Sequence, residues 1–209
     1  MYADPVPNSE VKPRRGGRGA RDRILRAATD LFYREGIHAT GVEKLSQAAE
    51  VSKRTFYQHF PSKTALVEDY LHGIDERGGT PLERRLDAKD TSPGDRLLAI
   101  FDSVAFDSVA LDAGAAPRFR GCPFHNAAVE SAGELAGVDE IVRAHKHRFA
   151  QRLTAVAAEA GAEHPAQLAQ QLLVLFEGGT ALATSLDDPA PLAHARSAAE
   201  VLIAHCGVT

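Results

Sequence analysis

A short segment of the chain carries four side chains that could bind a polyanion. They lie within seven consecutive positions: Lys53, Arg54, Tyr57 and His59. The ammonium and guanidinium groups can hold phosphate or donate to the acceptor atoms of guanine, and the two rings can donate a hydrogen bond or stack on a base. Phe56 and Phe60 stand four residues apart, so on a helix they face the same side. The spacing predicts a helix that buries these two rings and exposes the polar groups, a pattern that an ordinary surface helix also shows.

A helix-turn-helix unit would position these groups. Apolar residues on one side predict a short helix over 42–49, and about three residues separate it from the helix over 53–60. Thr40 and Glu43 have the spacing of a capping box at the start of the first of these helices, and Ser52 can cap the second. In such a unit the second helix enters the major groove of DNA and presents the side chains near its N-terminus to the bases.

Further helices are expected on both sides of this unit. Helical spacing of apolar residues begins at Ala20, Gly36 stands where a helix ends, and Ser62 can cap the helix after the unit. Ser92 and Pro93 suit the cap and the first position of another helix. The remaining helices are expected near 95–111, 123–132, 138–161, 165–186 and 191–205. No strand-like alternation of useful length is found in the sequence.

The predicted fold is all-α and divides into three parts. Residues 1–19 are rich in proline, glycine and arginine and are expected to form a disordered basic arm. Residues 20–63 are expected to form a three-helix helix-turn-helix domain, and residues 64–209 a larger helical bundle. Residues 1–63 hold 12 Lys and Arg against 7 Asp and Glu, a net charge of +5, whereas the remainder holds 12 against 21, a net charge of −9. Because polyphosphate must be met by positive charge, the basic part is expected to face nucleic acid.

The sequence argues against several other classes of protein. The longest apolar runs, such as 172–176, fall far short of the roughly 20 residues that cross a bilayer, and no secretory leader is apparent. A cytoplasmic protein with no membrane partner is therefore expected. Cys122 and Cys206 are far apart, so neither a disulfide framework nor a metal site is expected, and no cofactor is implied. Common motifs for nucleophiles, phosphate loops, zinc proteases and dinucleotides are missing, so an enzyme is not expected.

The helix-turn-helix segment resembles the DNA-binding signature of the TetR family of transcriptional regulators. The resemblance runs from Ala39-Thr40-Gly41-Val42 through Val51-Ser52-Lys53-Arg54-Thr55-Phe56-Tyr57-Gln58-His59-Phe60-Pro61-Ser62-Lys63. It continues more loosely through the bundle, and it implies a homodimeric repressor that binds a palindromic operator in double-stranded DNA. A small-molecule inducer would release the repressor. Glu50 departs from the pattern, because the family usually has glycine at this position of the turn.

The resemblance also implies which residues meet the DNA. Thr40 and Val42 would approach the DNA backbone at the start of one helix, and Lys63 would hold a phosphate together with the amides of the following helix. The expected DNA-binding residues are Thr40, Val42, Ser52, Lys53, Arg54, Thr55, Tyr57, His59 and Lys63.

A segment in the second half of the chain resembles a Gly-Cys-Pro-Phe sequence found in one group of TetR-like regulators. It begins at Gly121, and in the family this region borders the ligand pocket and relays its occupancy to the DNA-binding domain. The resemblance therefore implies a ligand pocket with aromatic walls and a few polar anchors. The expected ligand-binding residues are Phe101, Phe106, Phe124, His125, Asn126, Phe149, Phe176 and Glu177. Ordinary core packing is the alternative for each of these phenylalanines.

Several features have two interpretations. Small residues at helical spacing in 165–186 and 191–205 suit either contact between two copies about a two-fold axis or packing within one copy. Cys122 and His125 could ligate a metal, act as a redox switch or act in catalysis, or they could be a buried thiol and a hydrogen-bonded histidine. The basic arm over 1–19 could hold phosphate, bind RNA or simply be solvated.

Overall fold

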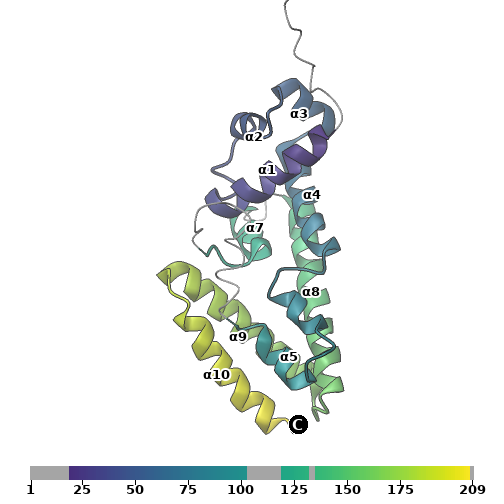
Figure 1. The fold of residues 1–209 in the computed structure, drawn as a ribbon, viewed down its shortest axis with the longest axis vertical. Helices are drawn as coiled ribbons and strands as arrows, with labels where there is room; N and C mark the ends of the chain where they lie inside the picture. The colour runs from purple at the N-terminus through teal and green to yellow at the C-terminus, as the bar shows by residue number, and fades with distance from the viewer. Residues whose placement is uncertain (1–18, 103–118, 132–134, 208–209) are drawn as a thin grey trace, which may run out of the picture.

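Helices account for the regular structure of the protein, and no strand occurs among the residues that the structure describes (Figure 1). The computed structural model describes residues 19–102, 119–131 and 135–207. The elements are α1 (Ala20–Glu35), α2 (Val42–Ala48), α3 (Lys53–His59), α4 (Lys63–Glu76), the 3-10 helix η1 (Glu83–Asp87), α5 (Pro93–Ala99), α7 (Pro123–Ser131), α8 (Ala136–Glu159), α9 (Pro165–Leu186) and α10 (Ala190–His205). The prediction of an all-α fold is confirmed. Residues 1–18 of the predicted arm lie outside the described residues.

Three helices begin at the serines that the sequence indicates. The Ser52 hydroxyl accepts a hydrogen bond from the main chain of α3, at 3.0 Å from the Thr55 amide nitrogen. Ser62 caps α4 in the same way, and Ser92 caps α5, whose first residue is proline. Each hydroxyl satisfies one of the amide groups that a helix leaves unpaired at its N-terminus. α5 ends at Ala99, so it is shorter than predicted, and residues 103–111 of the predicted helix lie outside the described part of the chain.

The predicted capping box at the start of α2 is wrong. The residue that precedes the helix is Gly41, and no side chain caps it. Thr40 is fully buried, and its hydroxyl donates instead to the carbonyl of Gly36 at 2.7 Å. A buried hydroxyl needs a partner, and the unpaired carbonyl groups at the end of α1 supply one.

Two hydrophobic cores follow one another along the molecule (Figure 1). The upper core joins α1, α2, α3 and α4 with α7 and the first part of α8, and the lower core joins α5, the rest of α8, α9 and α10. In the upper core, Phe56 and Phe60 are both buried and their ring centroids lie 6.0 Å apart. Their burial determines which side of α3 faces solvent.

The turn between α2 and α3 contains a residue in the left-handed region of backbone space. Glu50 has φ 53°. The main chain is held on both sides of it, because Arg23 donates to the Ala49 carbonyl at 3.0 Å and the Val51 amide donates to the Ser46 carbonyl at 2.9 Å. A residue with a Cβ pays about 1–2 kcal/mol for this conformation, which glycine adopts freely. The turn therefore keeps its geometry with glutamate, under strain.

Replacing Glu50 with glycine is expected to raise the free energy of unfolding by about 1 kcal/mol, because the strain is removed. Urea denaturation at a fixed protein concentration measures the change. Ala48→Gly, two residues away in the last turn of α2, is the matched control and should lower the free energy of unfolding by about 1 kcal/mol. Equal destabilisation by the two substitutions would show that the left-handed conformation at Glu50 is not strained.

Candidate nucleic-acid interface and ligand cavity

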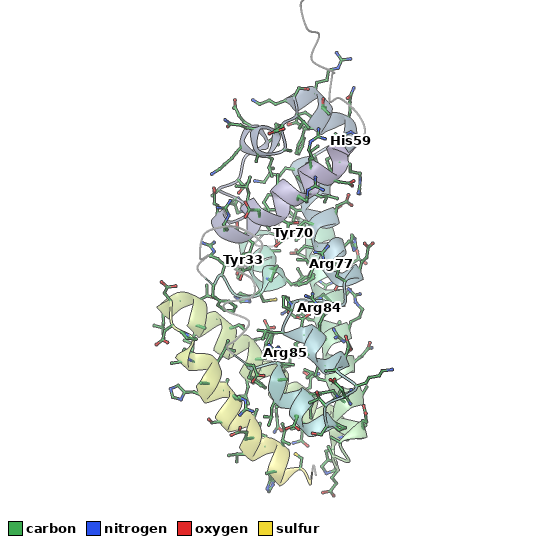
Figure 2. The ribbon with its side chains drawn as sticks, viewed as in Figure 1. Tyr33, His59, Tyr70, Arg77, Arg84 and Arg85 are labelled. Carbon is green, nitrogen blue, oxygen red and sulfur yellow. The ribbon has the colours of Figure 1, made fainter. Side chains whose placement is uncertain are left out.

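The outer side of α3 is a polar surface backed by buried aromatic rings. Lys53 and Arg54 are exposed, and Tyr57 is 52% exposed although it is one of the larger hydrophobic side chains. The ring of Tyr57 meets that of Phe56 edge to face, with centroids 5.3 Å apart. His59, at the other end of the helix, is half-buried (Figure 2). The helix thus holds an aromatic donor and two cations out to solvent on a rigid base.

The polar groups at the start of α3 make only weak contacts within the protein. The Lys53 ammonium lies 3.1 Å from a carboxylate oxygen of Glu43, and both side chains are largely exposed. Such surface pairs contribute little to stability, so the lysine can exchange its partner for a phosphate. The hydroxyls of Ser52 and Thr55 lie 2.9 Å apart, and the Thr55 side chain is half-buried. The Ser52 hydroxyl also accepts from the Thr55 amide, so both hydroxyls belong to the first turn of α3.

The other expected DNA-binding residues lie in different surroundings. The Thr40 side chain is buried, and that of Val42 is half-buried against the upper core. Lys63 lines a small cavity of about 140 Å³ between α4 and α7. Burial lowers the pKa of Lys63, and the nearby carboxylate of Glu130 partly offsets this effect. Lys63 therefore lies at the edge of the DNA-binding unit, next to the body of the protein.

Glu130 on α7 ties the body to the loop that leads into α2. One of its carboxylate oxygens accepts a hydrogen bond from the His38 amide at 2.7 Å, and its carbonyl contacts the His38 ring. The same carboxylate packs against Gly36, since a Cβ added to Gly36 would lie 3.1 Å from it. These contacts join α7 directly to the loop between α1 and α2. The sequence does not predict the contact between Glu130 and His38, because the two residues are about ninety positions apart in the chain.

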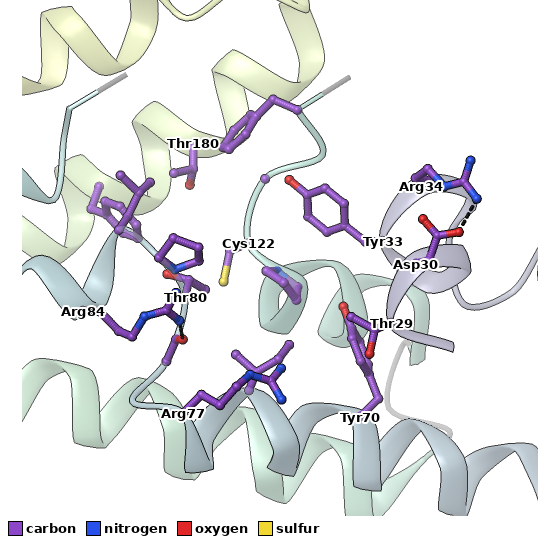
Figure 3. A pocket seen from close by; sticks show the side chains of 18 of the residues that line it. Thr29, Asp30, Tyr33, Arg34, Tyr70, Arg77, Thr80, Arg84, Cys122 and Thr180 are labelled. Carbon is purple, nitrogen blue, oxygen red and sulfur yellow. Dashed lines mark hydrogen bonds and ion pairs between the residues drawn. The ribbon is translucent and has the colours of Figure 1, made fainter. Parts of the chain in front are cut away.

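A large cavity lies between the helix-turn-helix unit and the body (Figures 2 and 3). Its volume is about 960 Å³, near the upper end of the range for small-molecule sites. α1, α4, the segment before η1, the segment before α7 and α9 all contribute to its walls. The lining residues are Arg26, Thr29, Asp30, Tyr33, Arg34, Tyr70, Ile74, Arg77, Gly79, Thr80, Pro81, Leu82, Arg84, Phe119, Gly121, Cys122, Pro123, Phe176 and Thr180.

The structure places one of the expected ligand-binding phenylalanines on this cavity. Phe176 lines it, while Phe101 and Phe149 are buried behind Phe176, with ring centroids 6.2 Å and 5.4 Å from it. Phe124 is fully buried, and Phe106 lies outside the described residues.

The polar residues expected in the pocket do not line the cavity. His125 is exposed, and the side-chain amide of Asn126 donates to the Arg120 carbonyl at 2.6 Å. Glu177 forms an ion pair with Lys146. Of the expected polar anchors, none is among the cavity's lining residues.

Neutral polar groups face the interior of the cavity. Burial raises the pKa of both Tyr33 and Tyr70, so both remain phenols at neutral pH. Burial also raises the pKa of the Cys122 thiol to about 11, even though the Lys146 ammonium lies 3.5 Å from its sulfur. The Tyr33 oxygen accepts a hydrogen bond from the Arg120 amide at 3.2 Å, so its own hydrogen can be donated elsewhere.

The thiol and the neighbouring histidine are not brought together. Cys122 is buried, whereas the side chain of His125 is exposed. Within the described ranges, no group of three His, Cys, Asp or Glu side chains could hold a metal ion. The local geometry therefore offers neither the ligand set of a metal site nor a cysteine–histidine pair.

A buried ionic network connects α8 to the end of α4 and to η1. The two ring nitrogens of His145 lie 2.7 Å from an Asp75 oxygen and 3.1 Å from a Glu83 oxygen. The ring also stacks on Phe124, with centroids 3.4 Å apart. Burial alone would raise the pKa of the fully buried Glu83, but the hydrogen bond and charge of His145 bring that pKa below its ordinary value. Each ring nitrogen of His145 thus has a carboxylate oxygen within hydrogen-bond distance, and the ring bridges Asp75 and Glu83.

Family models and relatives agree on the class of protein. A model described as "Bacterial regulatory proteins, tetR family" matches residues 24–70, and one described as "Tetracyclin repressor-like, C-terminal domain" matches residues 93–199. The chain is 38% identical over 80 residues to the HTH-type transcriptional regulator TcmR of Streptomyces glaucescens, a match that covers 38% of this chain and 35% of that protein. It is 30% identical over 137 residues to an uncharacterized HTH-type transcriptional regulator of Mycobacterium tuberculosis strain H37Rv, covering 64% of this chain and 63% of the relative. The matches thus span less than two thirds of these relatives.

Solved structures show similarity over nearly the whole chain. A TetR transcriptional regulator of Streptomyces avermitilis has a TM-score of 0.73 and 29% sequence identity, and the match covers 91% of this chain and 99% of that one. A TetR-family regulator of Streptomyces coelicolor has the same TM-score and identity, with 90% and 95% covered. In the part of the chain that the structure describes, no helix is long and apolar enough to span a membrane.

Proposed function

This chain belongs to the TetR family of bacterial transcriptional regulators, and we propose that it is a homodimeric repressor that a small-molecule inducer releases from a palindromic operator. As a member of this family the chain is a DNA-binding regulator and not an enzyme. The observation that carries the proposal is the outer side of α3, where Tyr57 and two cations are held out to solvent by buried rings. A protein that binds operator DNA would act in the cytoplasm.

In the proposed complex, α3 lies in the major groove. Lys53, Arg54 and Tyr57 contact base edges or phosphates, and the hydroxyls of Ser52 and Thr55 lie near a phosphate at the helix N-terminus. The remaining expected contacts are made at the edges of the unit, by His59, Val42 and Lys63. Because its side chain is buried, Thr40 would contribute through the main chain only.

Tyr57→Ala and Lys53→Ala are each expected to weaken binding to the specific operator by about 1–3 kcal/mol, where a base contact is lost. Lys63→Ala is expected to weaken binding to all DNA sequences alike, because its partner is a phosphate. Sequences selected from random duplex DNA provide the operator, and titrations at fixed salt concentration against operator and unrelated DNA provide both affinities.

Lys89→Ala is the control, because Lys89 is also an exposed lysine but lies in the loop before α5. It should leave both affinities unchanged. Selection of no palindromic sequence would contradict the proposal. So would a protein whose nucleic-acid binding survives Lys53→Ala and Tyr57→Ala but disappears when residues 1–18 are deleted, since binding would then reside in the arm.

The surface of α9 and α10 supports the proposed dimer. Val174 and Leu182 on α9 and Val201 on α10 are 71%, 56% and 70% exposed. The small residues predicted to serve an interface are used partly within the chain, because a Cβ on Gly179 would lie 3.1 Å from the Cβ of Ala195. The exposed apolar side chains belong to the same two helices, and two copies could bury them in a four-helix interface about a two-fold axis.

The position of the cavity supports control by a ligand. Its walls combine α1 and α4 of the upper core with Phe119 and Phe176 of the lower core and Thr180 of α9. A ligand that binds better to one relative position of these walls shifts the population towards that position. The contact between His38 and Glu130 transmits the same shift to the start of α2. The distance between the two recognition helices of a dimer would change accordingly.

A further inference from the structure

The charged side chains around the large cavity are unequal in sign. Four arginines line it, together with a single aspartate. Arg34 forms an ion pair with Asp30, and Arg84 donates to the Gly79 carbonyl at 2.8 Å. Arg26 and Arg77 form no ion pair with any residue that the structure describes. Two guanidinium groups at the cavity are therefore available to a ligand.

The other walls of the cavity are suited to an apolar body. Tyr70, Phe119 and Phe176 offer buried aromatic surface, and Leu82 offers buried aliphatic surface. The phenol of Tyr33 points into the cavity and towards Cys122 (Figure 3). A ligand that matches these walls carries a hydrophobic ring system or chain.

The two arginines come from different parts of the upper core. Arg77 follows the last residue of α4, and Arg26 belongs to α1. Both side chains line the cavity and are exposed, so they can reach an anion without first giving up a carboxylate partner. Guanidinium matches the geometry of carboxylate and phosphate oxygens with two parallel hydrogen bonds.

We propose that this cavity binds an apolar organic anion, whose hydrophobic body lies against the aromatic walls and whose carboxylate or phosphate lies at Arg77 and Arg26. The inference rests on the proposed function, in which the occupant of the cavity is the inducer. Because Arg26 belongs to α1 and Arg77 directly follows α4, the anion draws together the two helices that carry the recognition helix. The hydrophobic part of the ligand contacts Phe119 and Phe176, which belong to the lower core.

Calorimetric titration of the full-length protein with three probes of one shape tests the charge preference. The probes are 2-naphthoate, 2-naphthyl phosphate and the neutral 2-naphthamide. At least one anion should bind ten-fold or more tightly than the amide, and comparison of the two anions distinguishes carboxylate from phosphate. Arg77→Met should reduce the affinity for that anion about ten-fold and leave the amide unchanged, and Arg26→Met should act in the same direction. Arg143→Met, an exposed arginine of α8 that does not line the cavity, should change neither affinity.

Three results would overturn the inference: equal affinity for the amide and both anions, equal weakening of amide and anion by Arg77→Met, and no binding of any probe at millimolar concentration. Arg77→Lys is the control for a folding defect. It retains the positive charge, so it should keep most of the preference for the anion over the amide. Operator binding is measured in the same samples. Anion binding that depends on Arg77 but leaves the operator complex intact would support the anion site and contradict the inducer role. Release of the operator by the amide alone would support the inducer role of the cavity and contradict the anion site.

Discussion

Replacing His145 with alanine is expected to lower the free energy of unfolding by about 3–5 kcal/mol. The substitution leaves the fully buried carboxylate of Glu83 without the imidazole nitrogen 3.1 Å away, and it leaves Asp75 without the ring nitrogen at 2.7 Å. Removing one member of a buried ion pair costs more than the pair contributes, because the remaining charge stays desolvated. The ring that stacks on Phe124 is also lost. Urea denaturation at a fixed protomer concentration measures the effect.

His147→Ala is the control for this substitution. His147 lies two positions further along α8 and is exposed, so its loss should change the free energy of unfolding by less than about 0.5 kcal/mol. A loss below 1 kcal/mol for His145→Ala would mean that Glu83 is solvated or protonated in the folded protein, contrary to the network described.

The same network predicts how stability responds to acid. The pKa of Glu83 is lower in the folded protein than its ordinary value of 4.5. A carboxyl with a lowered pKa contributes stability that is fully present above its unfolded pKa and is lost as the pH falls through its folded pKa. The parent protein should therefore lose this contribution below pH 4.5. In His145→Ala the imidazole no longer lowers the pKa, and only the Thr80 amide and the charge of Lys146 still oppose the effect of burial, so this acid-dependent loss should become smaller.

Introducing charge on the outer side of α9 and α10 is expected to abolish dimerisation. Leu182→Glu combined with Val201→Glu places two carboxylates on the apolar surface proposed for the interface. Sedimentation should show a monomer at micromolar concentration. Operator affinity should fall by about 10²–10⁴-fold, because a dimer binds its second half-site as an intramolecular event and a monomer does not.

Val129→Glu is the matched control, since Val129 is 64% exposed but belongs to α7. It should leave the dimer and its operator affinity unchanged. A double variant that remains dimeric would place the interface elsewhere, and a monomeric variant with full operator affinity would show that dimerisation is unnecessary for binding.

The helix caps show how local and distant causes differ. The serines at 52, 62 and 92 cap their helices as predicted, because a cap depends on an amide only three residues away. The Thr-x-x-Glu pattern at position 40 satisfied the same local rule and nevertheless failed. There the packing of α1 above the loop buries the hydroxyl of Thr40 and offers it the carbonyl of Gly36.

The sequence by itself determined the helical fold and the exposed side of α3, because Phe56 and Phe60 decide by their spacing alone which side chains point outward. Only the tertiary structure decided the cavity. Tyr33 and Cys122 reach its interior from distant parts of the chain, and no pattern within one segment records that they meet. The same holds for His145, whose two carboxylate partners are 70 and 62 positions away. Helices depend on neighbours within a turn, whereas a cavity or a buried ionic network depends on how finished helices pack.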